Sequence, residues 1–434
     1  MTDHVLATLL VALITFGSAL ASAPPSLQQP TQARQADAFV DSVGVNVHLH
    51  YYDTAYADFA GKVLPNLRDL GVRHIRDGVC PVADDTKPGR FRTLFTELGV
   101  RATLIVDPRC ESVAEAAAYI QKLGTGLLDA LEGPNEYDLS GDPDWAGVAR
   151  AYQAELYGVF KSLPKTASVP IIGPSVTSEA AAETLGDATQ TADIVNLHSY
   201  YSFRPPETQG WGDDGYGSLG WQLRAIAQPL GASTDAQDAP PFVVTEAGYH
   251  NAAGDGVPEA VAAAYLPRLL LKHFDNGVER TFLYELLDEL DEPENREANF
   301  GLVRFDGSKK PAFVALQNLL TLLNDPGKAF VPGALAFTLS PAPDTLEWTL
   351  LQKRNGDFYL AVWDGAAIFD PGADPETVSA QTVTLSFSEP VGAIGRALPN
   401  RSARWEPLTQ TGSSVELAIG PEITLLQITP SPQP

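Results

Sequence analysis

The sequence has few basic residues, few cysteines and only one apolar run of a length that interacts with membranes. Of its 434 residues, 29 are lysine or arginine and 54 are aspartate or glutamate, so the formal net charge at pH 7 is −25. Such an acidic chain repels phosphate backbones and anionic lipid headgroups, which argues against a nucleic-acid partner or a membrane-surface partner. The other interpretation is that the acidity serves solubility alone.

The one long apolar run, Val5–Phe16, lies at the N-terminus and has the length of a signal-peptide core. Small residues follow it, so residues 1–23 are expected to be a signal peptide. An uncleaved anchor is the alternative, because Asp3 stands where a basic residue is usual. Residues 24–38, rich in Pro, Gln and Ala, are expected to be a linker. We therefore expect a secreted, periplasmic or cell-surface protein with no membrane span after signal removal.

Only two cysteines are present, Cys80 and Cys110. An oxidising compartment permits a disulfide between them, and each follows a predicted strand on the same side of the fold. Such a bridge would close a loop of about 30 residues and stabilise the fold by about 3 kcal/mol in the entropic model. Two free thiols are the alternative.

Between residues 39 and 325, short apolar runs alternate with stretches of helical periodicity. The predicted strands are Val43–Leu49, Val72–Arg76, Ala102–Val106, Leu127–Glu132, Val169–Ile172, Ile194–His198, Phe242–Thr245 and Thr281–Tyr284. Several of these runs are continuously apolar, which is typical of a parallel sheet covered by helices on its outer face. Eight such units predict an α/β fold of the (β/α)₈ TIM-barrel type, with a doubly wound open sheet as the alternative.

From residue 326 to residue 434 the pattern changes to strands without intervening helices. Leu346–Leu351 and Phe358–Trp363 are predicted strands, joined by a turn at Asn355-Gly356. Apolar and polar residues alternate over 383–387 and 415–419. We expect this region to be a β-sandwich appended to the barrel at 39–325.

Two glutamates follow predicted strands at the edge where a TIM barrel carries its active site. Glu136 comes after the fourth strand and Glu246 after the seventh. A retaining glycosidase needs two carboxyl groups about 5–5.5 Å apart, one as acid/base and one as nucleophile. We expect Glu136 to be the acid/base and Glu246 the nucleophile. The neighbouring Asn135 is suited to bind a sugar 2-hydroxyl.

The segments around these glutamates resemble those of clan A of the glycoside hydrolases. The run Gly133-Pro134-Asn135-Glu136 is similar to the acid/base segment of the clan, and Val244-Thr245-Glu246 is similar to its nucleophile segment. Phe300–Val303 followed by Lys310–Ala312 resembles the entry to the last barrel helix. The barrel-plus-sandwich plan is most similar to glycoside hydrolase family 39. The resemblance implies an arginine, Arg76, bonded to Glu246; an ion pair with Asp77 is the alternative.

Further substrate-binding candidates lie at other strand ends and in the loop after the sixth strand. They are His48, His50, His198, Tyr200, Tyr201, Trp211, Tyr284 and Glu285. The spacing of His48 and His50 by two residues places both on one face if the strand continues that far. The alternatives are a core role for the histidines and tryptophan, and a solvent-exposed Glu285.

Two rival functions are consistent with parts of the sequence. His48, His50 and His198 suggest a metal-dependent amidohydrolase, but Glu136 stands where that class needs a lysine, and no histidine follows the fifth strand. A non-catalytic glycan-binding barrel is the second rival. The preferred prediction is a monomeric retaining glycosidase without metal or cofactor, endo-acting on a neutral glycan.

Overall fold

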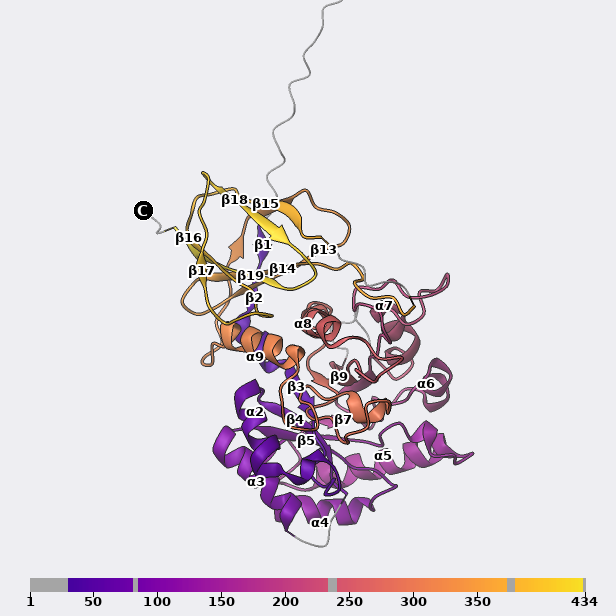
Figure 1. Cartoon of the computed structure of the whole chain (residues 1–434). Helices are drawn as coiled ribbons and strands as arrows, with labels where there is room; N and C mark the ends of the chain where they lie inside the picture. Colours follow the sequence, from indigo (N-terminus) through magenta and orange to yellow (C-terminus); the bar gives the residue numbers. More distant parts are fainter. Residues whose placement is uncertain (1–29, 81–84, 233–239, 373–378, 432–434) are drawn as a thin grey trace, which may run out of the picture.

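The computed structural model describes residues 30–80, 85–232, 240–372 and 379–431. The expected signal peptide at 1–23 lies outside the described residues. The described chain forms an eight-stranded parallel sheet surrounded by helices, and a separate set of antiparallel strands packed beside it (Figure 1). The predicted TIM barrel with a β-sandwich is therefore confirmed. The division at residues 325 and 326 stays a prediction.

The barrel has one strand for each predicted unit. Its strands are β3 (Val43–Asn46), β4 (His74–Gly78), β5 (Arg101–Ile105), β6 (Leu128–Glu132), β7 (Ile171–Ile172), β8 (Val195–His198), β9 (Phe242–Ala247) and β10 (Thr281–Leu283). Parallel neighbours follow the order β7-β6-β5-β4-β3-β10-β9-β8. A parallel bridge between Ile172 and Ile194 joins the two outer strands. All strands point the same way, so their carboxyl ends meet at one mouth.

Helices cover the outside of the barrel. They are α1 (Ala36–Asp41), α2 (Leu64–Leu70), α3 (Thr86–Leu98), α4 (Val113–Leu123), α5 (Trp145–Ser162), α6 (Glu179–Leu185), α7 (Leu219–Gln222), α8 (Glu259–Asp275) and α9 (Pro311–Leu323). A capping box of Ser112 and Glu115 opens α4. Helix α3 begins at Thr86, before Phe91, where the apolar residues of helical spacing begin. Its first turns bury Lys87 and Arg90, so they lack the apolar periodicity that predicts a helix.

The C-terminal strands form two sheets. The strands are β12 (Phe337–Ser340), β13 (Leu346–Gln352), β14 (Phe358–Asp364), β15 (Gln381–Phe387), β16 (Val391–Ala397), β17 (Glu406–Pro407), β18 (Ser414–Ile419) and β19 (Thr424–Pro430). One sheet has the order β12-β15-β18 and the other the order β17-β16-β19-β14-β13-β2. The predicted turn joins β13 to β14, with Gly356 at φ 90°, where a side chain would be strained.

The sandwich also contains residues from the start of the described chain. Strand β1 (Thr31–Gln32) pairs with β11 (Ala334–Leu335), and β2 (Arg34–Gln35) pairs in parallel with the edge of β13. In Figure 1 these indigo strands lie among the orange and yellow ones. The linker expected at 24–38 thus differs from the structure over these residues. Two-residue polar strands have no pattern of their own and form because a partner edge accepts them.

Candidate active site

Arg76, in the middle of β4, is 2% exposed and bonds to side chains from other barrel strands. Its Nε and Nη2 atoms donate to Glu132, each at 2.7 Å, and Nη1 donates to Glu246 Oε1 at 2.8 Å. The alternative partner Asp77 instead accepts hydrogen bonds from the backbone N–H groups of Leu49 and Gly78. Arg76 is therefore bonded to Glu246, as the resemblance implies, and not paired with Asp77.

The two glutamates face each other across the mouth. Glu246 belongs to β9, and Glu136 follows β6 in a left-handed conformation with φ 43°. One oxygen of Glu136, one oxygen of Glu246 and a ring nitrogen of His198 all lie within 4.8 Å of one another. Tyr200 donates its hydroxyl to Glu246 Oε2 at 2.9 Å. The two carboxylates are thus close enough to act on one atom between them.

His198, the last residue of β8, connects the two carboxylates. Its Nδ1 lies 2.7 Å from Glu136 Oε1 and 3.5 Å from Glu246 Oε2. Its Nε2 lies 3.1 Å from Thr245 Oγ1, and that hydroxyl donates its proton to Asn196 Oδ1 at 2.7 Å. Because the hydroxyl proton is committed to Asn196, Oγ1 accepts from Nε2–H, which assigns the Nε2–H tautomer when the ring is neutral.

The protonation of His198 and Glu136 is linked. Burial alone would raise the pKa of Glu136, but the hydrogen bond to His198 and the charges of Arg76 and Arg109 bring that pKa below its ordinary value. Burial alone would lower the pKa of His198, but the charge of Glu246 and the bond to Glu136 raise it above its ordinary value. The pair therefore holds one proton between Nδ1 and Oε1.

Asn135 is held in place by contacts on both its backbone and its side chain. Its Oδ1 accepts from Arg76 Nη2 at 2.6 Å and from Ser175 Oγ at 3.2 Å. Its backbone N–H donates to Asp107 Oδ2 at 3.0 Å, and its carbonyl accepts from Arg109. Among the described residues, its Nδ2 donates no hydrogen bond, so that donor is available to a ligand.

Of the other residues predicted to bind substrate, some lie at the mouth of the barrel and others lie away from it. Tyr284 lines the central cavity, and the buried Glu285 beside it accepts from Tyr56 and lies 3.3 Å from His48 Nε2. Burial and the charge of Glu289 raise the pKa of Glu285 well above its ordinary value. Tyr201 is fully buried, and its hydroxyl lies 2.9 Å from His273 Nε2, so it packs in the core.

His48 and His50 do not share one set of partners. Strand β3 ends at Asn46, so the alternation on which the prediction rested does not reach them. His48 contacts Glu285, whereas His50 Nδ1 lies 3.0 Å from the Nζ of Lys87. Among the described residues, the side chains close enough to hold one metal ion group His48 with Glu285 and Glu289, and His198 with Glu136 and Glu246, so the three histidines of the rival amidohydrolase site do not converge.

A cavity of about 690 Å³ opens above the two carboxylates. Its wall includes the predicted residues Asn135, Glu136, Tyr200, Glu246 and Tyr284. Four further residues were not predicted from the sequence. They hydrogen-bond the predicted site residues directly or through one another, and they are Glu132, Asn196, Thr245 and Ser175. The available signal was a glutamate, Glu132, as the last residue of a predicted barrel strand.

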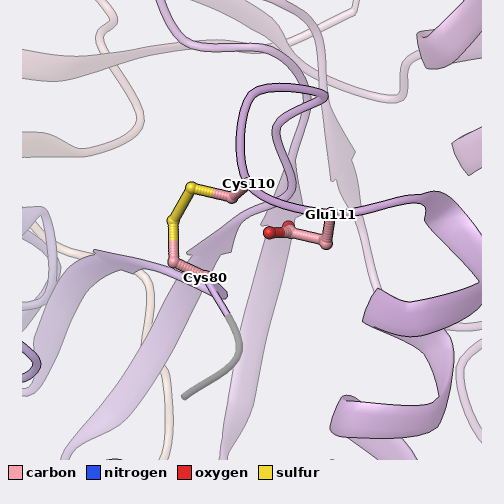
Figure 2. A group of neighbouring side chains, drawn as sticks. All are labelled: Cys80, Cys110 and Glu111. Carbon is pink, nitrogen blue, oxygen red and sulfur yellow. A yellow bond between two sulfur atoms is a disulfide. The ribbon is translucent and has the colours of Figure 1, made fainter. Parts of the chain in front are cut away.

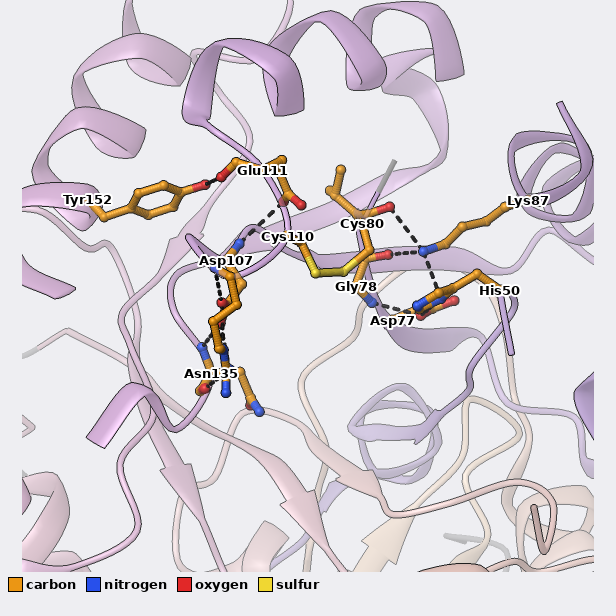
Figure 3. The surroundings of a disulfide bond; sticks show 12 residues. His50, Asp77, Gly78, Cys80, Lys87, Asp107, Cys110, Glu111, Asn135 and Tyr152 are labelled. Atoms are coloured by element: carbon orange, nitrogen blue, oxygen red, sulfur yellow. Dashed lines mark hydrogen bonds and ion pairs between the residues drawn. A yellow bond between two sulfur atoms is a disulfide. The ribbon is translucent and has the colours of Figure 1, made fainter. Parts of the chain in front are cut away.

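Cys80 and Cys110 form a disulfide, with Glu111 beside it (Figure 2). Because both sulfur atoms are bonded to each other, neither is a thiolate ligand for a metal ion. The bridge ties the end of β4 to the loop after β5, and that loop carries Asp107, which holds Asn135 (Figure 3). The disulfide therefore supports the segment that carries Glu136.

Removing this bridge is expected to destabilise the protein. The bridge closes a loop of 30 residues, and the double variant Cys80→Ser with Cys110→Ser should lose about 3 kcal/mol of unfolding free energy. Thermal unfolding followed by circular dichroism would show a midpoint lower by about 3–5 °C. The untreated and dithiothreitol-treated native protein are the matched comparison. An unchanged midpoint in both experiments would contradict the prediction.

The fold is shared with solved structures of glycoside hydrolases. A family 39 glycoside hydrolase from Bacteroides cellulosilyticus superposes with a TM-score of 0.64 at 16% identity, over 91% of this chain and 81% of that chain. A glucosidase from Croceicoccus marinus gives 0.60 at 13%, over 93% and 97%. A GH51 arabinofuranosidase from Xanthomonas axonopodis gives 0.55 at 14%, over 92% and 98%.

No family model and no curated protein matches the sequence. The likeness to solved structures is therefore one of fold at low sequence identity. It extends over the barrel and the sandwich together, since each of the three structures covers more than nine-tenths of the chain. The chain thus has the barrel-and-sandwich fold of clan A glycoside hydrolases, as the resemblance of its strand-end segments implies.

Proposed function

We propose that the protein is a retaining glycoside hydrolase with Glu246 as nucleophile and Glu136 as acid/base. One observation carries the proposal: an oxygen of each carboxylate lies within 4.8 Å of the other across a cavity of about 690 Å³. Retaining enzymes hold their carboxyl groups about 5–5.5 Å apart, whereas inverting enzymes need about 6.5–9.5 Å to admit a water molecule. The separation supports double displacement.

The surroundings of Glu246 suit a nucleophile. Arg76 and Tyr200 each donate one hydrogen bond to it, one to each carboxylate oxygen, and the carboxylate is the group proposed to attack an anomeric carbon. These donors also fix the carboxylate in place, so little reorganisation is needed when the glycosyl ester forms.

The surroundings of Glu136 suit a group that gives and takes one proton. In the first step the proton shared with His198 passes through Glu136 to the leaving oxygen, while Glu246 bonds to the sugar. In the second step Glu136 takes a proton from water, which attacks the glycosyl ester and releases the sugar with its configuration retained. The free Nδ2 of Asn135 is the proposed donor to the sugar 2-hydroxyl.

A neutral oligosaccharide or polysaccharide is the proposed substrate class. The chain carries a net charge of −25, which disfavours an acidic polymer. We infer export from the apolar run Val5–Phe16 together with the disulfide, which is typical of oxidising compartments. In the described residues, no helix has the length and apolar character needed to span a membrane.

Covalent labelling tests the proposal directly. The protein is incubated with 2-deoxy-2-fluoro glycosyl fluorides of the glucosyl, xylosyl and arabinofuranosyl series, and the digested product is analysed by mass spectrometry. The fluorine at C2 slows release of the sugar, so a glycosyl ester on Glu246 should accumulate. If the protein cleaves a glycan but the ester forms on another residue, the assignment fails. If no glycan is cleaved and no ester forms, the non-catalytic glycan-binding barrel is favoured.

The proton shared by Glu136 and His198 predicts a pH effect. In the native protein the pair loses its proton near the raised pKa of His198, above the ordinary 6.5. In His198→Asn the proton resides on Glu136 alone, whose ordinary value is 4.5. We therefore expect the alkaline limb of kcat/KM to move to lower pH in the variant, because the raised pKa of His198 no longer sets it. His250→Asn, in the same cavity but without a carboxylate of the pair as partner, is the control. An unmoved limb in His198→Asn would count against the shared proton.

A further inference from the structure

A second cavity adjoins the candidate active site on the side of Glu136. It has a volume of about 380 Å³ and shares Glu136, Tyr200 and Ser202 with the central cavity. Glu246 lines the central cavity but is not among the described residues that line the second one. Glu136 is therefore the carboxylate that stands between the two cavities. Both volumes lie in the range of small-molecule sites, about 300–1,000 Å³.

One wall of the second cavity is aromatic, and Tyr216 is its exposed ring. Tyr216 is 55% exposed, which is unusual for a large aromatic side chain. Beneath it lies the buried Trp221, with ring centroids 4.4 Å apart, and Trp211 lies at its side at 5.9 Å. The ring is thus supported by protein on two sides and open to solvent on the rest of its surface.

Trp211, the residue expected from the sequence to bind substrate, has its ring occupied by protein. The guanidinium carbon of Arg204 lies over the ring, 4.3 Å from its centroid. Gly217, at φ 80°, packs against the same ring so closely that a Cβ would lie 1.9 Å from it. Trp211 therefore supports Tyr216 and is not the stacking surface.

Another part of the lining of the second cavity is polar. It comes from the start of α6 and the two residues before it, where Thr177, Ser178 and Glu179 line the cavity and are exposed. A sugar ring presents an apolar C–H face and an equatorial belt of hydroxyl groups. A cavity lined by an exposed aromatic ring together with hydroxyl and carboxylate groups matches both surfaces.

The chemistry of the proposed function decides which part of the substrate this cavity takes. The sugar that is attacked must lie over Glu246, in the central cavity. The oxygen that leaves must lie at Glu136, which protonates it, so the remainder of the leaving group extends past Glu136. The second cavity begins at that carboxylate.

Resting on the proposed function, we infer that the second cavity binds a sugar of the leaving group and that Tyr216 is its stacking surface. The substrate is then a glycoside whose leaving group is itself a neutral sugar, as in an oligosaccharide or an internal position of a polysaccharide. A leaving group of one atom gains nothing from this cavity. Tyr216 is a binding residue that determines specificity and takes no part in proton transfer.

The test compares two substrates that share the same glycone. One is the glycosyl fluoride of whichever sugar series labels Glu246, and the other is an oligosaccharide that ends in that sugar. For Tyr216→Ala, we expect kcat/KM on the oligosaccharide to fall about tenfold, as loss of one aromatic contact implies, and hydrolysis of the fluoride to be unchanged. Phe95→Ala removes an exposed ring from α3, far from the mouth, and should leave both rates unchanged.

A second measurement uses the fluoride as donor and the same oligosaccharide as acceptor. In the native protein the acceptor binds in the second cavity and competes with water for the glycosyl ester, and Tyr216→Ala should lower the ratio of transfer to hydrolysis. The inference is overturned if Tyr216→Ala slows both substrates equally, or slows neither, or leaves the transfer ratio unchanged. Failure of the native protein on every fluoride would instead overturn the proposed function, and the inference with it.

Discussion

Glu246→Ala is expected to reduce kcat by roughly 10⁵-fold on every glycoside, because it removes the proposed nucleophile and the alanine side chain cannot attack the anomeric carbon. The variant is expected to fold. Arg76 loses one partner but keeps both hydrogen bonds to Glu132, so its charge stays paired in the core. Rates on a glycosyl fluoride, with circular dichroism to check the fold, measure the loss.

Azide gives this prediction a specific chemical result. The alanine leaves space beside Arg76, and azide is a small anion that can enter it and attack the anomeric carbon. One displacement replaces two, so the product should be the glycosyl azide of inverted configuration, identified by nuclear magnetic resonance. Glu279→Ala, at the opposite end of the barrel beside β10, is the matched control and should keep native activity. Inverted azide from the native protein, or none from Glu246→Ala, would contradict the nucleophile assignment.

Glu136→Ala is expected to give a loss that depends on the leaving group. An oligosaccharide needs a proton on its leaving oxygen, and the loss of a general acid costs about 10²–10⁴-fold in rate. Fluoride and dinitrophenolate leave without a proton, so the first step on those substrates should keep its native rate. The glycosyl ester on Glu246 then accumulates, because water lacks its base. A burst of released dinitrophenolate followed by slow turnover is the expected time course.

The configuration of the azide product distinguishes the roles of the two glutamates. In Glu136→Ala, azide needs no base and should attack the accumulated ester, which gives the glycosyl azide of retained configuration. Glu136→Gln, which keeps the size of the side chain, should behave in the same way apart from slower azide entry. Equal losses on fluoride and oligosaccharide substrates would remove Glu136 from the acid/base role.

The fold was predictable from sequence where structure follows a local apolar pattern. Several barrel strands are continuous apolar runs because both their faces are buried. The stretch 56–70 has the apolar periodicity of a single helix, yet the structure has a 3₁₀ turn at Ala55–Ala57 and a π turn at Phe59–Val63 before α2. Hydrophobic periodicity does not distinguish these turns from an α-helix.

The candidate site was predictable where a residue is fixed by its position at a strand end. Glu246 and Arg76 belong to this class, because they lie within barrel strands, and parallel strands bring their carboxyl ends to one mouth. Glu136 lies beyond the end of β6, and the resemblance of its segment supported its prediction as well. Tyr201 and His50 were placed by the same argument, but the chain has left the strand at both positions. Their partners, His273 and Lys87, come from helices, and no strand pattern encodes such contacts.

The pairing of β2 with β13 has a consequence for how the protein is made. Arg34 lies beside Leu351, so the earliest part of the described chain to leave the ribosome has its partner more than three hundred residues later. The barrel can begin to fold during synthesis, but the sheet edge that residues 34 and 35 complete cannot exist until β13 has emerged. Any cleavage of the nascent N-terminus, and any chaperone that binds it, therefore acts on a segment that has not yet paired with its partner strand.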